Sequence, residues 1–149
     1  MVIYYFGYGS NLSSAMMRDW CPDYQLIGAG QLIGWELVFT RFSERWGAGV
    51  ADIIQRKDSI VWGGLYQISE ADLVSLDIKE SNGQHYQRIS CEVIVNDLSY
   101  KAFTYVVIDK SSKPIASSNA YRDTMLTGAQ ELNLPEAYIA KIANLPISG

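Results

Sequence analysis

Two short segments of the sequence carry groups that could do chemistry. The first is Tyr8-Gly9-Ser10-Asn11-Leu12, which follows a short apolar run and precedes a helical pattern. A turn from a buried strand into a helix directs backbone N–H groups at one point, where they can bind an anion. Gly7 and Gly9 would let a ligand approach the backbone closely. The same pattern also fits a tight turn with capping residues, so both interpretations stay open.

The second segment is Asp77-Ile78-Lys79-Glu80, at the end of a predicted helix. Asp77 and Glu80 are three residues apart and therefore share one face of the helix. Negative charge is unfavourable at a helix C-terminus, so these carboxylates are either solvated or held there for a purpose. Paired carboxylates can act as general acid and base, although most charged side chains are simply exposed.

Three other features of the sequence could indicate a function but lack a complete motif. The spacing of Gly7, Gly9 and Leu12 imitates the start of a dinucleotide-binding fingerprint, but the third glycine is absent and hairpins follow. His85, the one histidine, has no nucleophile motif to serve and is predicted to be an exposed loop residue. Tyr121, taken alone, is predicted to be a packing residue.

Composition narrows the classes of function. The chain has 149 residues, the size of one domain, so we expect a single domain over residues 1–149. Its net charge of -4 and lack of a basic run argue against a nucleic-acid partner. We expect a cytoplasmic protein with no membrane segment, because no apolar stretch is long enough to span a bilayer. The two cysteines, Cys21 and Cys91, indicate neither a disulfide framework nor a metal site, and nothing in the sequence specifies an oligomeric state.

The elements that position these segments follow from periodicity and from turn residues. An apolar run over Val2–Phe6 predicts a central strand, and Asn96-Asp97 predicts the turn of a hairpin. Ser69 with Asp72 predicts a capping box at the start of the helix that ends near Glu80. The other strands are expected over Gln25–Leu32, Trp35–Thr40, Ala48–Ile54, Ile60–Gln67, Ile89–Val95 and Tyr100–Ile108, and the other helices over Leu12–Trp20, Asn119–Leu132 and Pro135–Ala143.

Taken in order, these motifs resemble those of the γ-glutamylcyclotransferases. The resemblance runs from about Phe6 to Leu145 and rests on an ordered set of short motifs: Tyr8-Gly9-Ser10-Asn11-Leu12 after an apolar strand, Val61-Trp62-Gly63, Asp77-x-x-Glu80, Tyr86 and Tyr121. It implies an α+β fold with a mixed, partly closed β-barrel and flanking helices. The implied reaction cyclises a γ-glutamyl group to 5-oxoproline and releases the attached amine or amino acid.

The resemblance also implies roles for individual residues. Glu80 would be the catalytic acid and base, and no cofactor or metal would be needed. The substrate would be bound by Gly7, Tyr8, Gly9, Ser10, Asn11, Leu12 and Tyr121. Because Glu80 would have to exchange protons with the substrate, we expect it to be partly buried.

The chain departs from the family pattern directly after Glu80. Many members have glycine there, whereas this sequence has Ser81-Asn82-Gly83. Members of the superfamily act on γ-glutamyl amino acids, γ-glutamyl amines, glutathione or γ-glutamyl-protected antibiotic precursors, and the residues favour none of these. Two other hypotheses stay open: a non-catalytic module that binds γ-glutamyl compounds or small anions, and an interaction domain in which Glu80 lies exposed and far from Gly9.

Overall fold

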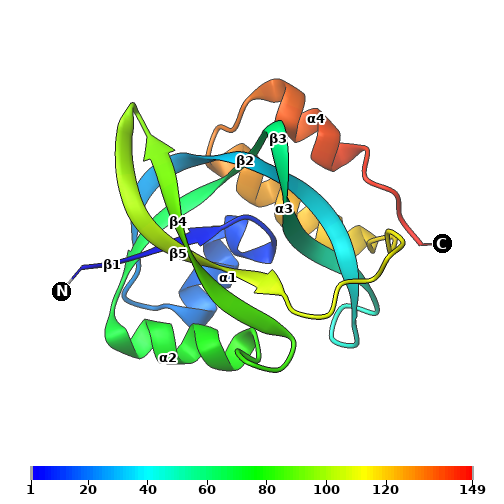
Figure 1. The fold of residues 1–149 in the computed structure, drawn as a ribbon, viewed down its shortest axis with the longest axis horizontal. Coiled ribbons are helices and arrows are strands. Elements are labelled where there is room, and N and C mark those ends of the chain that lie inside the picture. Colours follow the sequence, from blue (N-terminus) through cyan, green and yellow to red (C-terminus); the bar gives the residue numbers. More distant parts are fainter. Residues whose placement is uncertain (1, 149) are drawn as a thin grey trace.

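The computed structural model describes residues 2–148, and its strands form a closed barrel (Figure 1). Hydrogen-bonded neighbours follow the order β1-β3-β2-β4-β5 around the barrel. β1 is parallel to β5 and every other pair is antiparallel, so the predicted mixed barrel is confirmed. The strands are β1 (Ile3–Gly7), β2 (Gln25–Ser43), β3 (Ala48–Ile68), β4 (Tyr86–Val95) and β5 (Leu98–Val107).

Two short stretches of strand pairing close the barrel. β1 pairs with β5 in register through Tyr5 and Phe103, and β2 pairs with β4 through Gln31 and Ile94. Long ladders join β2 to β3 and β4 to β5. The predicted hairpin of β4 and β5 turns at Asn96-Asp97, where both residues have positive φ, as a two-residue turn requires.

The four strands predicted between Gln25 and Gln67 are two long strands. The predicted breaks are irregularities within β2 and β3, because the pairing register shifts between Ile33 and Trp35. Gly34 has a φ of +86° and Asp58 a φ of +68°, so the backbone bends at these residues without leaving the sheet. β2 and β3 therefore extend past the barrel as one long hairpin.

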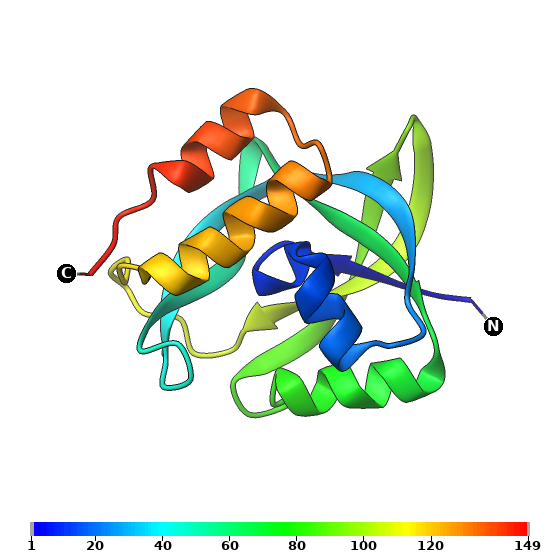
Figure 2. The ribbon, with the colours of Figure 1, turned by 180° about the vertical axis from the view of Figure 1, so that it is seen from behind.

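The helices lie in two pairs on the outside of the barrel. In Figure 2, α1 (Ser14–Trp20) and α2 (Glu70–Lys79) lie side by side, and α3 (Asn119–Glu131) and α4 (Glu136–Ala143) form the other pair. Ser69 caps α2 with the predicted capping box. Over residues 2–148, none of the helices has the length and apolar character to cross a membrane.

Three helix boundaries differ from the prediction. The segment predicted as one helix over Leu12–Trp20 is a 3-10 turn, η1 (Ser10–Leu12), followed by α1, because Ser13 is extended and caps α1 through its hydroxyl. α3 ends one residue before Leu132, and Asn133 follows with a φ of 54°. Pro135 is the residue before α4 and not part of its first turn.

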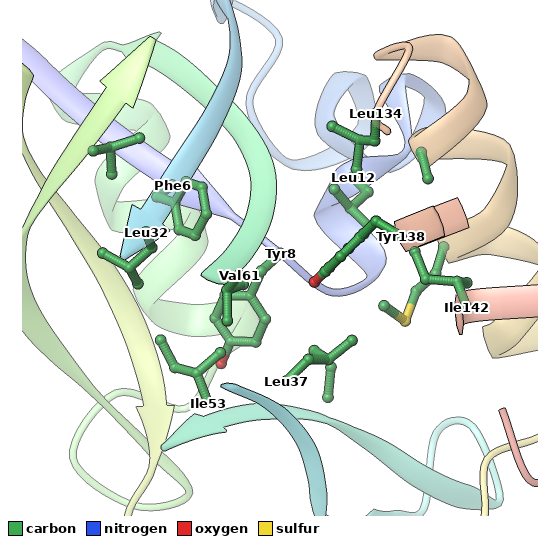
Figure 3. Packing of buried hydrophobic residues seen from close by; sticks show 14 of the residues in the cluster. Phe6, Tyr8, Leu12, Leu32, Leu37, Ile53, Val61, Leu134, Tyr138 and Ile142 are labelled. Carbon is green, nitrogen blue, oxygen red and sulfur yellow. The ribbon is translucent and has the colours of Figure 1, made fainter. Parts of the chain in front are cut away.

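The core is divided into two clusters by the barrel wall. Side chains on a strand alternate between its faces, so Phe6 of β1 joins one cluster and Tyr5 the other. The first cluster fills the barrel and continues beneath α3 and α4, as Figure 3 shows for Phe6, Leu32, Val61, Leu12, Leu134, Tyr138 and Ile142. The second includes Met17 and Leu76, from α1 and α2.

The buried tyrosines predict a loss of stability at alkaline pH. Burial raises the pKa of seven of the ten tyrosines, Tyr5, Tyr8, Tyr66, Tyr86, Tyr105, Tyr121 and Tyr138. The folded protein keeps these protons while the unfolded chain releases them above about pH 10. The contribution of these tyrosines to the free energy of unfolding should therefore be constant below about pH 9. Above about pH 10 it should fall by up to about 1.4 kcal/mol per pH unit for each tyrosine.

Urea unfolding from about pH 8 to about pH 11.5, with phenolate absorbance recorded in parallel, measures this loss. Tyr138→Phe removes one of the buried phenols. The free energy of unfolding of this variant should fall less steeply with pH, by the contribution of one tyrosine. A free energy of unfolding that stays level up to about pH 11.5 would contradict the assignment.

Candidate active site

The turn after β1 is fixed by close packing. β1 ends at Gly7, and the chain then tightens into η1, in which the Leu12 N–H donates to the Gly9 carbonyl at 3.0 Å. A Cβ at Gly9 would lie 2.7 Å from the hydroxyl oxygen of Tyr121. A Cβ at Gly128 of α3 would overlap the backbone of Leu12. Glycine at these two positions lets α3 pack directly against the turn.

Asn11 is the most densely bonded residue of the turn. Its side chain is buried, its Nδ2 donates to the hydroxyl of Tyr5 at 2.8 Å, and its Oδ1 accepts from Lys79 Nζ at 2.6 Å. The hydroxyl of Tyr66 donates to its backbone carbonyl at 2.8 Å. These bonds join the turn to β1, to β3 and to the end of α2.

The end of α2 determines where Glu80 lies. Glu80 is the C-cap, and its N–H donates to Leu76 O at 2.9 Å. Ser81 then takes a left-handed φ of 48°, and Asn82 N–H donates back to Asp77 O at 2.9 Å, which together form a Schellman motif. The Glu80 side chain is 16% exposed, as expected for a group that is not fully solvated.

The turn and the end of α2 open into one pocket of about 620 Å³. Of the residues that the sequence predicts for the site, the pocket is lined by Tyr8, Gly9, Ser10, Asn11, Glu80 and Tyr121. Gly7 and Leu12 are buried and do not line it. His85 is exposed, as predicted, and lies at this pocket.

Five buried tyrosines surround Glu80 from separate elements. They are Tyr5 of β1, Tyr8 of the turn, Tyr86 of β4, Tyr105 of β5 and Tyr121 of α3. Burial raises the pKa of each phenol, and the negative charge of Glu80 raises each pKa further. These phenols therefore stay protonated near neutral pH and line the pocket as uncharged groups.

Sequence reasoning missed the contribution of the β2–β3 hairpin. Arg41, Arg45 and Trp46 line the pocket from this hairpin. The Arg41 guanidinium lies 5.6 Å from the ring centroid of Tyr86, and the ring of Trp46 packs edge-on against Tyr121 at 5.0 Å. No local motif marks these residues, because only the pairing of two long strands brings them to the pocket.

Sequence reasoning also gave no role to Lys79. It lines the pocket, and its ammonium group contacts Ser10, Asn11 and Glu80. The only signal in the sequence is its position next to Glu80.

The described residues offer no metal centre and no activated thiol. Over residues 2–148, no three histidine, cysteine or acidic side chains are grouped so as to hold a metal ion. Cys21 and Cys91 are free, and burial raises the pKa of each thiol to about 12. A thiol with so high a pKa is a poor nucleophile. The acid–base side chains that line the pocket are Glu44, Lys79, Glu80, His85 and Asp109.

The left-handed Ser81 predicts a stabilising substitution. The left-handed conformation costs a non-glycine residue about 1 to 2 kcal/mol. Glycine avoids this cost, but it loses more conformational entropy on folding, which cancels part of the gain. Ser81→Gly should therefore raise the free energy of unfolding by about 0.5 to 1 kcal/mol in urea denaturation. Ser75→Gly is the matched control within α2 and should lower it by a similar amount. A Ser81→Gly protein less stable than the parent would show that the serine side chain is needed there.

Comparisons with known proteins place the chain in a family. The model of the AIG2-like family matches residues 60–142, more than half of the chain. A γ-glutamylcyclotransferase of Mus musculus is 30% identical over 147 residues, which cover 93% of this chain and 76% of the relative. That of Homo sapiens is 29% identical over 147 residues, with 93% and 76% covered. A solved γ-glutamyl cyclotransferase structure shares the fold, with a TM-score of 0.93 at 24% identity over 99% of this chain and 90% of that one. The protein thus belongs to the AIG2-like family and is an enzyme of the γ-glutamylcyclotransferase type.

Proposed function

We propose that this protein, as a single catalytic domain over residues 1–149, cyclises a γ-glutamyl group to 5-oxoproline and releases the attached amine or amino acid. Glu80 is the general acid and base of the reaction. One observation carries the proposal: Glu80 and residues 8–11 of the turn line the same pocket of about 620 Å³. The relatives named γ-glutamylcyclotransferase support the choice of reaction.

The chemistry needs one group that both accepts and donates a proton. The α-amine of the γ-glutamyl group attacks the side-chain carbonyl carbon, a new C–N bond closes the five-membered ring, and the original amide C–N bond breaks. Glu80 takes a proton from the attacking amine and passes it to the leaving nitrogen. Nucleophile and electrophile belong to one molecule, so the pocket chiefly has to fold the substrate into a reactive shape.

The turn supplies the groups that would hold the substrate. We propose that backbone N–H groups of Gly9, Ser10 and Asn11 bind an anionic oxygen of the γ-glutamyl moiety, and that Tyr8 and Tyr121 line its other sides. The Leu12 N–H is already bonded within the turn, so Leu12, like Gly7, acts through the shape of the turn. The protonated phenols near Glu80 contribute hydrogen-bonding groups without adding charge.

Replacing the catalytic carboxylate should abolish most of the turnover. Glu80→Gln keeps the size of the side chain but cannot carry a proton between the two nitrogens. We expect kcat to fall by roughly 10² to 10⁴, or about 2.7 to 5.5 kcal/mol of transition-state stabilisation, with an unchanged thermal midpoint. The assay is mass-spectrometric detection of 5-oxoproline from a panel of γ-glutamyl amino acids, γ-glutamyl amines and glutathione.

Glu70→Gln is the matched control, because Glu70 is an exposed glutamate in the first turn of the same helix. It should leave turnover unchanged. Full activity in Glu80→Gln would remove the acid–base assignment. Thermal stabilisation by a γ-glutamyl compound that yields no product would instead indicate a non-catalytic binding module.

A further inference from the structure

Lys79 is a buried lysine inside the pocket. It lies in the last turn of α2, and its side chain is only 5% exposed. Lysines are almost never this buried unless their charge is paired, because removing an ammonium group from water is costly. A glutamine or methionine could fill the same space on α2 without that cost. The burial of this charge therefore calls for an explanation other than packing.

The ammonium group contacts both polar side chains of the turn and the proposed catalytic carboxylate. Lys79 Nζ lies 3.1 Å from Ser10 Oγ, 2.6 Å from Asn11 Oδ1 and 3.7 Å from Glu80 Oε1. An ammonium group has three N–H donors, and three oxygen partners lie around this one. Asn11 cannot rotate away, because its Nδ2 is bonded to the Tyr5 hydroxyl. A single cation thus connects the two halves of the site.

The titratable groups that act on the Lys79 ammonium come from three places in the fold. Burial lowers the pKa of Lys79, the charge of Glu80 raises it, and Arg45 of the β2–β3 hairpin lowers it. Cys21, after α1, is the other titratable group that acts on it. Glu80 itself faces Lys79 and the phenols Tyr5, Tyr8, Tyr86, Tyr105 and Tyr121, whose raised pKa values keep them neutral. The other charged or titratable side chains that line the pocket are Arg41, Glu44, Arg45, His85 and Asp109. Among the described residues, Lys79 is the cation that forms an ion pair with Glu80, at 3.7 Å.

We propose, on the basis of the function proposed above, that Lys79 is a positioning residue for the cyclisation: its ammonium group ties Ser10 and Asn11 to Glu80 and pairs with the carboxylate that accepts the substrate proton. Lys79 acts through Glu80 and the turn and does not itself exchange protons with the substrate. Its loss should affect both the rate of the chemical step and the pH at which the enzyme gains activity. A purely structural contact would affect neither the pH profile nor the protonation of Glu80.

Three substitutions separate charge from hydrogen bonding. Lys79→Gln keeps a donor without charge, Lys79→Met removes both, and Lys79→Arg keeps the charge. Lys141→Gln is the matched control, because Lys141 is the exposed lysine in the last turn of α4. Each protein is assayed for 5-oxoproline release as a function of pH. Thermal unfolding is recorded for each variant, so that a misfolded protein is recognised.

We expect Lys79→Gln and Lys79→Met to lower kcat by roughly 10-fold or more, with a smaller change in KM. Removing a positive charge makes protonation of the neighbouring carboxylate easier. The acidic limb of the profile of kcat/KM should therefore move to higher pH. Lys79→Arg should restore the position of the limb, and Lys141→Gln should match the wild type. An unmoved acidic limb in both neutral variants would overturn the proposal, whatever the fall in rate.

A second measurement does not depend on turnover. The ¹³C carboxyl signal of Glu80, assigned through Glu80→Gln, is titrated in the wild type and in Lys79→Gln. The signal should titrate at higher pH in Lys79→Gln, and identical titration curves would overturn the proposed coupling. If the wild type released no 5-oxoproline, the proposed function would fail on that result alone, while the titration would still decide whether Lys79 controls the protonation of Glu80.

Discussion

The buried side chain of Asn11 is the point on which the arrangement of the site depends. The polar atoms of a buried amide need partners, and Asn11 Nδ2 bonds Tyr5 of β1 while its Oδ1 bonds Lys79 of α2. Its backbone carbonyl is bonded by Tyr66 of β3. Because these partners belong to three separate elements, the turn can occupy only one position relative to the end of α2. The barrel and the helices thereby bring the turn and Glu80 to one pocket.

The immediate surroundings of Glu80 combine low exposure with one close ion pair. The carboxylate is mostly buried, five protonated phenols lie near it, and one ammonium group lies 3.7 Å away. Such an environment strengthens the interaction between Glu80 and Lys79, because little water screens it. Two further carboxylates, Glu44 and Asp109, line the same pocket, but Glu80 is the one that is paired with Lys79 among the described residues.

Local signals were sufficient to predict much of the fold. The apolar run of β1, the capping box of α2 and the Asn96-Asp97 turn each depend on neighbouring residues alone, and each is confirmed. The strand breaks predicted near Gly34 were wrong, because a glycine that bends a paired strand leaves the same signal as one that ends it. The membership of the chain in the family, inferred from the order of its motifs, is also confirmed.

The candidate site was only partly predictable, for a physical reason. The turn and Glu80 were recognisable from local patterns, whereas Arg41, Arg45 and Trp46 reach the pocket only because β2 and β3 continue beyond the barrel. Lys79 carries no motif, and its role depends on a contact with Asn11 across 68 positions of sequence. The catalytic role of Glu80 and the substrate-binding roles of the turn residues and Tyr121 stay predictions.

The most direct test of the account is a crystal structure of the Glu80→Gln variant with an uncleaved γ-glutamyl dipeptide. We expect the α-amine of the ligand to lie within about 3 Å of the side chain at position 80. We also expect a carboxylate or carbonyl oxygen of the γ-glutamyl group to accept hydrogen bonds from the backbone of Gly9, Ser10 or Asn11. A ligand bound elsewhere, such as the cleft between Glu36–Thr40 and Lys110–Ser117, or bound with its amine turned away from position 80, would contradict it.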